Sequence, residues 1–301
     1  MSGHDYRISA AGYSAAVTQQ GAAVRELTHE GRNLIVPFAI GEPMPDYRGA
    51  VVAPWPNRIP DGRYIFRGVE LTVPINEPSR AAALHGLVSH VPWTVLYHEP
   101  SRLGLRHVVR PSKGYPFGLL LDVNYVVDEA GFHTTVSATN TGEAVAPYGT
   151  CPHPYLVAGP SPLETWSLEL DAGTFLDVTP DRLIPVQRTS VDGTPFDFRS
   201  PHQLGGTAID HAFTDLGTIP GGDEVHLRLR DPGGTGVAMI WGEACPWVQL
   251  HTADHPIPER HRIGLAVEPM TCPPNAFNSG EDLVSLLPGA THNADWTFRA
   301  L

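Results

Sequence analysis

The stretch IGLAVEPM, residues 263–270, decides how we interpret the fold. Its apolar run Leu265–Val267 is typical of a buried strand. The run is followed by one carboxylate, Glu268, and then by Pro269 and a turn rich in proline, cysteine and asparagine. Because proline cannot donate a hydrogen bond to a sheet, we expect the strand to fray or end at Pro269. Glu268 then lies at the mouth of a sheet, either as a working acid or base or as a rim carboxylate in water.

The composition around this stretch favours many short strands joined by tight turns. The chain has 301 residues, of which 42% are hydrophobic and 17% charged, and it contains 30 glycines and 30 prolines. A large apolar fraction combined with abundant turn residues argues against disorder. No fixed-period repeat, linker or low-complexity tract interrupts the sequence, so we predict one domain over residues 1–301.

Alternating polarity places many of the strands. Residues 6–38 have the pattern of an opening β-meander, and the helical periodicity is poor throughout. Only short helical turns are expected, for example near Pro201–Leu204. The two clearest hairpins join Leu119–Val127 to Phe132–Asn140 and Val225–Arg230 to Val237–Trp241. These patterns predict an all-β fold, a large antiparallel β-sandwich with very little helix and with its chemistry on loops and strand ends.

The charge balance excludes several classes of partner. The net charge is −12 with only 20 Lys+Arg, so we expect no nucleic-acid or anionic-membrane partner. No apolar run approaches the roughly 18 residues of a membrane span, and no basic and apolar leader begins the chain, which favours the cytoplasm. The three cysteines, Cys151, Cys245 and Cys272, are odd in number and form no C-x-x-C motif, so we expect reduced thiols.

Two histidines lie in unusual local settings. His153 stands between Pro152 and Pro154, which fix the backbone on both sides and aim the imidazole. The alternative is a histidine in a surface loop. His85 precedes Gly86, and a glycine lets a ligand or a second backbone approach closely. The alternative there is a buried histidine bonded to a carbonyl.

Arg58 and Asp210 are the next candidates. Arg58 follows Asn57 in a proline-rich loop, and its guanidinium can fork onto two oxygens, although a surface arginine is the simpler interpretation. Asp210 is flanked by apolar residues. A buried acid is costly unless it is hydrogen-bonded, so this side chain either ties down its loop or accepts hydroxyl groups from a ligand.

One group of residues has metal-like spacing, but its context argues against a metal. Pro256 and Pro258 oppose the helix that would bring such side chains to one face, and the surrounding charges indicate a solvated loop. We therefore predict no metal site from this group, which comprises His251, His255, Glu259 and His261.

Taken together, the motifs resemble those of the aldose 1-epimerase (galactose mutarotase) family, and they occur in the family's order. They are Gly21-Ala22, Asn57-Arg58-Ile59 with Gly62-Arg63, Leu84-His85-Gly86, His153-Pro154-Tyr155, Asp210-His211-Ala212-Phe213-Thr214, Trp247-Val248-Gln249-Leu250-His251-Thr252, Val267-Glu268-Pro269 and Leu287-Pro288-Gly289. The resemblance implies a large antiparallel β-sandwich that binds a monosaccharide on a concave face. It also implies interconversion of the α and β anomers of a free aldose without a cofactor, by a monomer or homodimer.

The resemblance also assigns roles to residues. Glu268 looks like the general base and His153 like the general acid, and we expect the two to flank one pyranose from opposite sides. Arg58 and His85 look like partners of the sugar oxygens near the reacting centre. A second imidazole near His153 would push the two histidine pKa values apart. The substrate contacts implied by the motifs are Asn57, Tyr155, Asp210 and Gln249.

Three other functions stay open. A hexose-6-phosphate 1-epimerase needs several convergent cations, and apart from Arg58 and Arg63 the motif loops are poor in them. A non-catalytic carbohydrate-binding sandwich has the same fold without turnover. A metal-dependent enzyme would use His251, His255 and His261.

Overall fold

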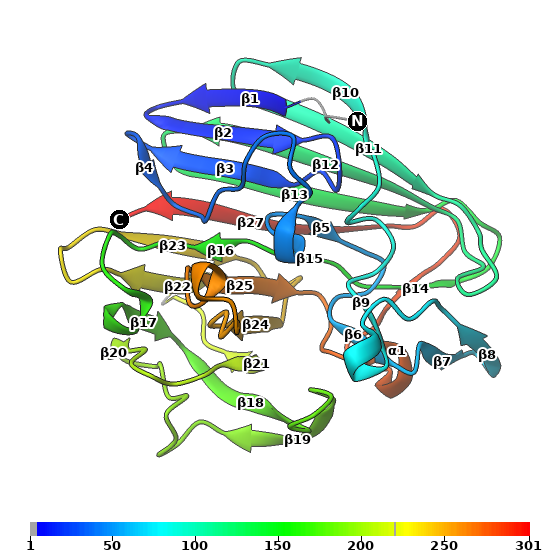
Figure 1. Cartoon of the computed structure of the whole chain (residues 1–301). Helices are drawn as coiled ribbons and strands as arrows, with labels where there is room; N and C mark the ends of the chain where they lie inside the picture. Colours follow the sequence, from blue (N-terminus) through cyan, green and yellow to red (C-terminus); the bar gives the residue numbers. More distant parts are fainter. Residues whose placement is uncertain (1–4, 220) are drawn as a thin grey trace.

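Three antiparallel sheets make up most of the structure, a computed structural model that describes residues 5–219 and 221–301 (Figure 1). The first has the order β1-β2-β3-β4, with β1 (Asp5–Ala10), β2 (Tyr13–Thr18), β3 (Val24–His29) and β4 (Arg32–Asn33). The second has the order β10-β11-β12-β13-β27-β23-β22-β17-β20, with β10 (Thr94–Glu99), β11 (Arg102–Val109), β12 (Leu119–Asp128), β13 (Gly131–Asn140), β27 (Thr291–Ala300), β23 (Gly236–Trp241), β22 (Val225–Arg230), β17 (Ser167–Leu170) and β20 (His202–Gln203). The third has the order β16-β25-β24-β21-β18-β19, with β16 (Tyr155–Leu156), β25 (Leu265–Met270), β24 (Trp247–His251), β21 (Asp210–Leu216), β18 (Ala172–Val178) and β19 (Pro185–Ser190).

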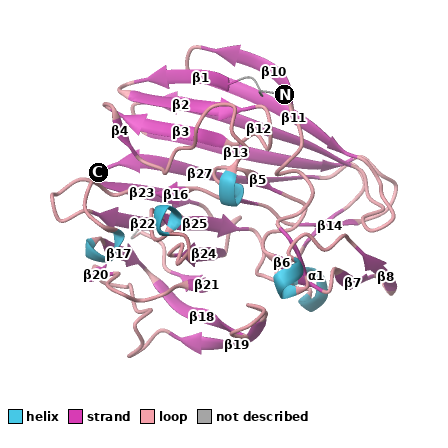
Figure 2. Ribbon diagram, viewed as in Figure 1, coloured by secondary structure: helices cyan, strands magenta, loops and turns pink. Residues whose placement is uncertain are grey.

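Short strand pairs and helical turns fill the connections (Figure 2). The pairs are β5 (Val51–Val52) with β15 (Cys151–Pro152), β6 (Arg58–Pro60) with β9 (Ala82–Leu84), β7 (Arg63–Phe66) with β8 (Val69–Thr72), and β14 (Ala146–Tyr148) with β26 (Val284–Leu286). Helix within the described residues is limited to α1 (Ala276–Ser279) and the 3₁₀ turns η1 (Pro45–Tyr47), η2 (Pro78–Arg80), η3 (Leu163–Thr165) and η4 (Pro258–Arg260). None of these helices is long and apolar enough to cross a bilayer.

The all-β antiparallel fold predicted from the sequence is confirmed, including both hairpins. In β12 and β13 buried residues alternate with partly exposed ones along most of each strand, as expected for strands with one face on a core. The helical turn expected near Pro201–Leu204 is wrong. Residues 202–203 form β20 instead, which pairs with β17 through Leu168 and His202.

The core lies between the faces of the sheets. One cluster of buried apolar side chains extends from Ile8 to Phe298 and includes residues of all three large sheets. In the third sheet Val248, Leu250 and Val267 belong to this cluster. Because successive side chains of a strand point to opposite faces, Gln249 and Glu268 face away from the core. The strand pattern therefore positions polar side chains on the outer face of this sheet.

Pro269 does not end its strand, contrary to our expectation. β25 continues to Met270, and Pro269 pairs with Val248 of β24. On the other side of β25, the N–H groups of Val267 and Thr271 donate to the carbonyls of Pro154 and Thr150. In that register Pro269 lies opposite Pro152, so its missing N–H interrupts only this seam of the ladder and leaves the β24 side intact.

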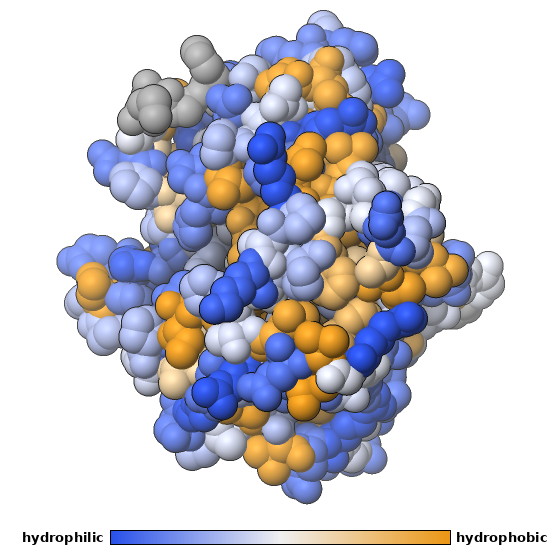
Figure 3. All heavy atoms as spheres, turned by 90° about the vertical axis from the view of Figure 1, so that its right-hand side faces the viewer, coloured by the Kyte–Doolittle hydropathy of each residue, from blue (hydrophilic) through white to orange (hydrophobic). Residues whose placement is uncertain are grey.

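The surface seen from the right of Figure 1 is largely hydrophilic with separate apolar patches (Figure 3). On this side the β7–β8 hairpin exposes Ile65 and Val69, at 63% and 57% of their surface. All three cysteines are buried and unpaired, as expected for reduced thiols.

Candidate active site

Strand register places His153 beside Glu268. Gln249 pairs with Glu268 across β24 and β25, and Tyr155 pairs with Ala266 across β16 and β25. Continuing the second register by two residues sets His153 opposite Glu268, where facing side chains are near neighbours. The Nε2 atom of His153 accordingly lies 3.4 Å from Oε1 of Glu268. Two groups that are more than a hundred residues apart in sequence thus meet through one sheet.

Both members of this pair are buried. Glu268 is 2% exposed and His153 is 5% exposed, so neither a rim carboxylate in water nor a surface-loop histidine describes them. Burial lowers the pKa of His153 to about 4, and the nearby His251 adds to the shift. Burial raises the pKa of Glu268 well above its ordinary value, and Asp210 adds to the shift, whereas the thiol of Cys151 and the charge of Arg58 oppose it. Burial therefore favours the uncharged pair over a carboxylate and an imidazolium.

The pair lies side by side, not on opposite sides of a sugar-sized space as we expected. The reason is the sheet, because cross-strand neighbours are held at the spacing of one ladder position. The Sγ atom of Cys151 donates to Oε2 of Glu268 over 3.7 Å, so that Oε1 is the oxygen turned to His153.

A cavity of about 420 Å³ opens at this pair, within the size range of small-molecule sites. Its walls include every site residue predicted from the sequence: Asn57, Arg58, His85, His153, Tyr155, Asp210, Gln249 and Glu268. The structure thus gathers in one place side chains from β6, β16, β21, β24, β25 and the loops between them.

The wall facing the sheet is formed by the β6–β9 pair. Arg58 pairs with Leu84, and the N–H of His85 donates to the carbonyl of Asn57 over 2.9 Å. Position 86 needs a glycine because a second backbone segment passes close to it, and not because a ligand does. A Cβ atom there would lie 2.0 Å from the carbonyl oxygen of Ala53. His85 is 6% exposed, and its buried Nδ1 has no partner among the described residues, so the expected carbonyl bond is not formed.

The two histidines of the cavity are in contact. The rings of His85 and His153 lie 4.8 Å apart and nearly perpendicular, and Tyr47 packs against both. Burial and then the neighbouring His153 lower the pKa of His85 well below its usual value. Since the pKa values of both histidines fall, burial leaves neither as an imidazolium near neutral pH, which differs from the expectation that one stays protonated.

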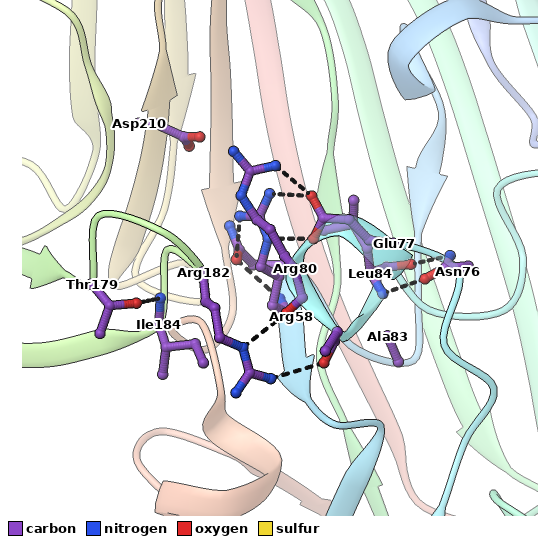
Figure 4. Close-up of polar contacts among 12 residues, drawn as sticks. Arg58, Asn76, Glu77, Arg80, Ala83, Leu84, Thr179, Arg182, Ile184 and Asp210 are labelled. Atoms are coloured by element: carbon purple, nitrogen blue, oxygen red, sulfur yellow. Dashed lines mark hydrogen bonds and ion pairs between the residues drawn. The ribbon is translucent and has the colours of Figure 1, made fainter.

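Arg58 is held by a partner that the sequence did not reveal. Its Nε and one terminal nitrogen donate to the two carboxylate oxygens of Glu77 at 2.7 and 2.9 Å, and Arg80 donates to the same carboxylate at 3.0 Å (Figure 4). Arg58 is buried, so a surface arginine is the wrong interpretation. The fork we expected to meet sugar oxygens is therefore largely occupied by Glu77.

A second cluster of arginines also lines the cavity. Arg48 and Arg260 both pair with Asp46, which precedes Tyr47 in the η1 turn. The cavity is thus lined by four arginines and not by Arg58 alone, which corrects our description of the site as poor in cations. Two carboxylates, Asp46 and Glu77, offset much of this charge.

Asp210 lies apart from the cluster around Arg58 (Figure 4). Its Oδ1 accepts the amide of Gln249 over 2.7 Å, and its Oδ2 is 3.7 Å from Nδ1 of His251. Gln249 is 3% exposed, and its carbonyl oxygen has no partner among the described residues. The Asp210–Gln249 pair therefore retains acceptors for a hydroxyl group and also ties two strands together.

The metal-like spacing in residues 251–261 does not produce a cluster. Nδ1 of His255 accepts the N–H of Ile257, and Nδ1 of His261 contacts the carbonyl of His255. Among the described residues, one set of three or more possible metal ligands comes together, and it consists of His85, His153 and Glu268.

The residues that sequence reasoning missed come mainly from two loops. Tyr47 and its neighbours follow a proline-rich segment that we treated only as a loop, and Glu77 lies between Asn76 and Pro78. Positive φ values at Asp46 and Tyr47 turn this segment toward the cavity. The local sequence pattern is an aromatic residue and several charged residues beside turn prolines. This pattern does not by itself identify the residues that they contact in the folded chain. The missed lining residues are Asp46, Tyr47, Arg48, Glu77, Arg80, Asp254 and Arg260, whereas His255 was considered from the sequence only as a metal ligand.

The chain belongs to the aldose 1-epimerase family, whose model matches residues 4–299. The uncharacterized protein YihR of Escherichia coli K12 is 33% identical over 97% of this chain and 91% of its own length. Human galactose mutarotase is 32% identical over 61% of this chain and 55% of its own length. In fold, the chain is similar to a putative aldose 1-epimerase from Escherichia coli K12, with a TM-score of 0.84 and 20% identity over 99% of each chain. The family resemblance seen in the sequence is confirmed.

Proposed function

We propose that the protein is a mutarotase that interconverts the α and β anomers of a free aldose such as glucose or galactose. The observation that carries the proposal is the buried pair His153 and Glu268, 3.4 Å apart at a polar cavity of about 420 Å³. Anomer exchange needs a proton removed from the C1 hydroxyl and a proton added to the ring oxygen. These two oxygens are bonded to the same carbon, so neighbouring proton carriers suit them.

Glu268 acts as the base and His153 as the acid in this proposal. The raised pKa of Glu268 makes its carboxylate a stronger base, and the lowered pKa of His153 makes its imidazolium a stronger acid. The proton that the pair shares passes from Glu268 to His153 before the step, and ring opening converts this less populated charged form back into the uncharged pair that burial favours. The aldehyde then rotates about C1–C2, and the same two protons return as the ring closes on the other face. Each such group typically contributes about 10²–10⁴-fold to the rate.

The remaining polar groups position the sugar. Gln249 and Asp210 present acceptors for hydroxyl groups from the sheet, while Asn57 and His85 line the opposite wall. Arg58 contributes its charge near the reacting centre while Glu77 holds its orientation, so it stabilises negative charge that develops on oxygen.

Polarimetry of freshly dissolved α-glucose and α-galactose tests the proposal. We expect the optical rotation to relax faster than the spontaneous rate, in proportion to protein concentration. Relaxation at the spontaneous rate with both sugars would contradict it. A sugar-binding protein without turnover would give the same negative result but would still bind the sugars in calorimetry.

A hexose-6-phosphate 1-epimerase is a second candidate, and the arginines of the cavity favour it. Arg48 is buried, and its Nε has no partner among the described residues, as is also true of Nε of Arg80. Arginine forks are well matched to phosphate oxygens. The same assay with glucose 6-phosphate decides between the two: a kcat/KM higher than that for glucose would favour the phosphorylated substrate, and an Arg48→Met variant should then lose this preference.

A further inference from the structure

The set His85, His153 and Glu268, here called the buried triad, adds to the two proton carriers a third residue, His85, that the proton transfers of the sugar chemistry do not require. The ligand atoms of its members all lie within 4.8 Å of one another, and all three residues are buried. Two imidazoles and one carboxylate form a donor set that zinc accepts in catalytic sites, which leave a further position open. The members come from β25, from the end of β9 and from the segment between β15 and β16, so the sheet and the β6–β9 wall hold them independently.

The spacing within the buried triad fits an ion better than a direct bond. Nε2 of His153 and Oε1 of Glu268 lie 3.4 Å apart, whereas a hydrogen bond between nitrogen and oxygen is usually about 2.7–3.2 Å long. Two ligands bound at about 2.1 Å to a tetrahedral zinc lie about 3.4 Å from each other. The rings of His85 and His153 meet edge to face with 4.8 Å between their centres. A ligand atom of His85 lies within 4.8 Å of those of His153 and Glu268, so His85 is the third ligand of the set.

The hydrogen-bond partners of the triad residues indicate how tightly the site should bind zinc. Oε2 of Glu268 accepts from the Cys151 thiol, which orients the carboxylate as the second sphere of a metal site does. Nδ1 of His85 and Nδ1 of His153 are buried without partners among the described residues. Since outer partners of this kind typically contribute about 10–100-fold to metal affinity, the site should be weaker than a resident zinc site.

We propose that the buried triad is a reversible binding site for a divalent metal of the zinc class, and that the metal excludes sugar from the cavity. Zinc would occupy the two proton carriers themselves, so metal and substrate would compete. The site differs from the His251, His255 and His261 set considered from the sequence. Exclusion of sugar rests on the proposed function, whereas binding of zinc does not.

Calorimetric titration of the full chain with ZnCl₂, after dialysis against a chelator, tests the binding. We expect one zinc per chain with micromolar affinity, and visible absorption bands of four-coordinate cobalt when Co²⁺ replaces it. His85→Ala and Glu268→Gln should each lower the affinity by at least about 100-fold, because each removes a ligand and not just an outer partner. Mg²⁺, which prefers six oxygen ligands, should not bind.

His255→Ala is the matched control, since it removes another cavity histidine outside the triad. It should leave zinc affinity unchanged, and thermal melts should show that each variant is folded. No saturable zinc binding, undiminished affinity in the His85 or Glu268 variant, or an equal loss in the His255 variant would overturn the proposal. If glucose and galactose both fail to weaken zinc binding while the triad variants abolish it, the metal site stands and the exclusion of sugar by the metal is overturned. Polarimetry of the metal-free chain then decides the proposed sugar function separately.

Discussion

The two walls of the cavity hold their functional groups in different ways. The sheet wall, formed by β16, β25, β24 and β21, places His153, Glu268 and Gln249 mainly by ladder register. The loop wall, formed by the β6–β9 pair with the η1 and η2 turns, holds Arg58 and His85 through ion pairs and residues with positive φ. Changes on the sheet wall should therefore act on the chemistry. Changes to the ion pairs that hold the loop wall together should act mainly on stability and sugar affinity.

The largest effect is expected from Glu268→Gln on the sheet wall. The amide fits the same space but cannot accept the proton, so kcat should fall by about 10²–10⁴-fold while sugar binding persists. Polarimetry gives the rate and calorimetry gives the binding. Undiminished turnover would show that Glu268 is not the base. A loss of sugar binding as large as the loss of rate would show that the sheet wall does not act on the chemistry alone.

Glu77→Gln addresses the loop wall. It leaves the buried guanidinium of Arg58 without its carboxylate, so the free energy of unfolding should fall by about 3 kcal/mol, and KM should rise more than kcat falls. Urea denaturation measures the first effect. The matched control is Glu99→Gln, which breaks an exposed pair with Arg102 and should cost less than about 1 kcal/mol. Equal losses in the two variants would remove the special role of Glu77.

The pH dependence tests the sheet wall without a mutation. The pair carries one shared proton near neutral pH, and His153, with a pKa of about 4, takes up a second as the pH falls. The pair then has no base, so kcat/KM should decline below about pH 4 by about tenfold per unit. At high pH Glu268 ionises and the pair loses its shared proton. The pKa of Glu268, which sets this alkaline limb, lies well above the ordinary carboxyl value. With circular dichroism as a control for unfolding, an acid limb at the ordinary histidine value of 6.5 would contradict this.

Cys151 should give the smallest effect. Its thiol bond to Glu268 lowers the carboxyl pKa, so Cys151→Ala should move the alkaline limb of kcat/KM to higher pH and cost less than about tenfold in rate. Cys151→Ser retains a donor and should restore the limb. Cys245→Ala, which removes another buried thiol, should leave the limb unmoved, and an equal shift there would show that the effect is one of packing.

The strands could be predicted because their signal is local. The alternation in residues 119–140 records which face of β12 and β13 meets the core, and the structure follows it. The predicted strand end at Pro269 was wrong because proline removes only one donor, on one side of a strand. The sequence cannot say that this side faces Pro152, where the opposing residue also lacks an N–H group.

The site could be predicted in membership but not in arrangement. Motif order named eight of the side chains that line the cavity, yet the contact of His153 with Glu268 depends on the register of strands distant in sequence. The pairing of Arg58 with Glu77, and of Asp46 with Arg260, likewise joins loops that only the folded chain brings together. No local feature of the sequence distinguishes Asp46 and Glu77 from acidic side chains that are simply solvated.

The seam where Pro152 meets Pro269 has one further consequence. Two amide-to-carbonyl bonds, from Val267 and Thr271, bridge a stretch of three facing pairs that an uninterrupted ladder would bridge with six. Local breathing of the sheet should therefore begin there, and the amide protons of Val267 and Thr271 should exchange with deuterium sooner than those of β24. The two proton carriers would then lie beside a sparsely hydrogen-bonded seam of their own sheet, where the spacing between the strands can adjust as a sugar ring opens and recloses.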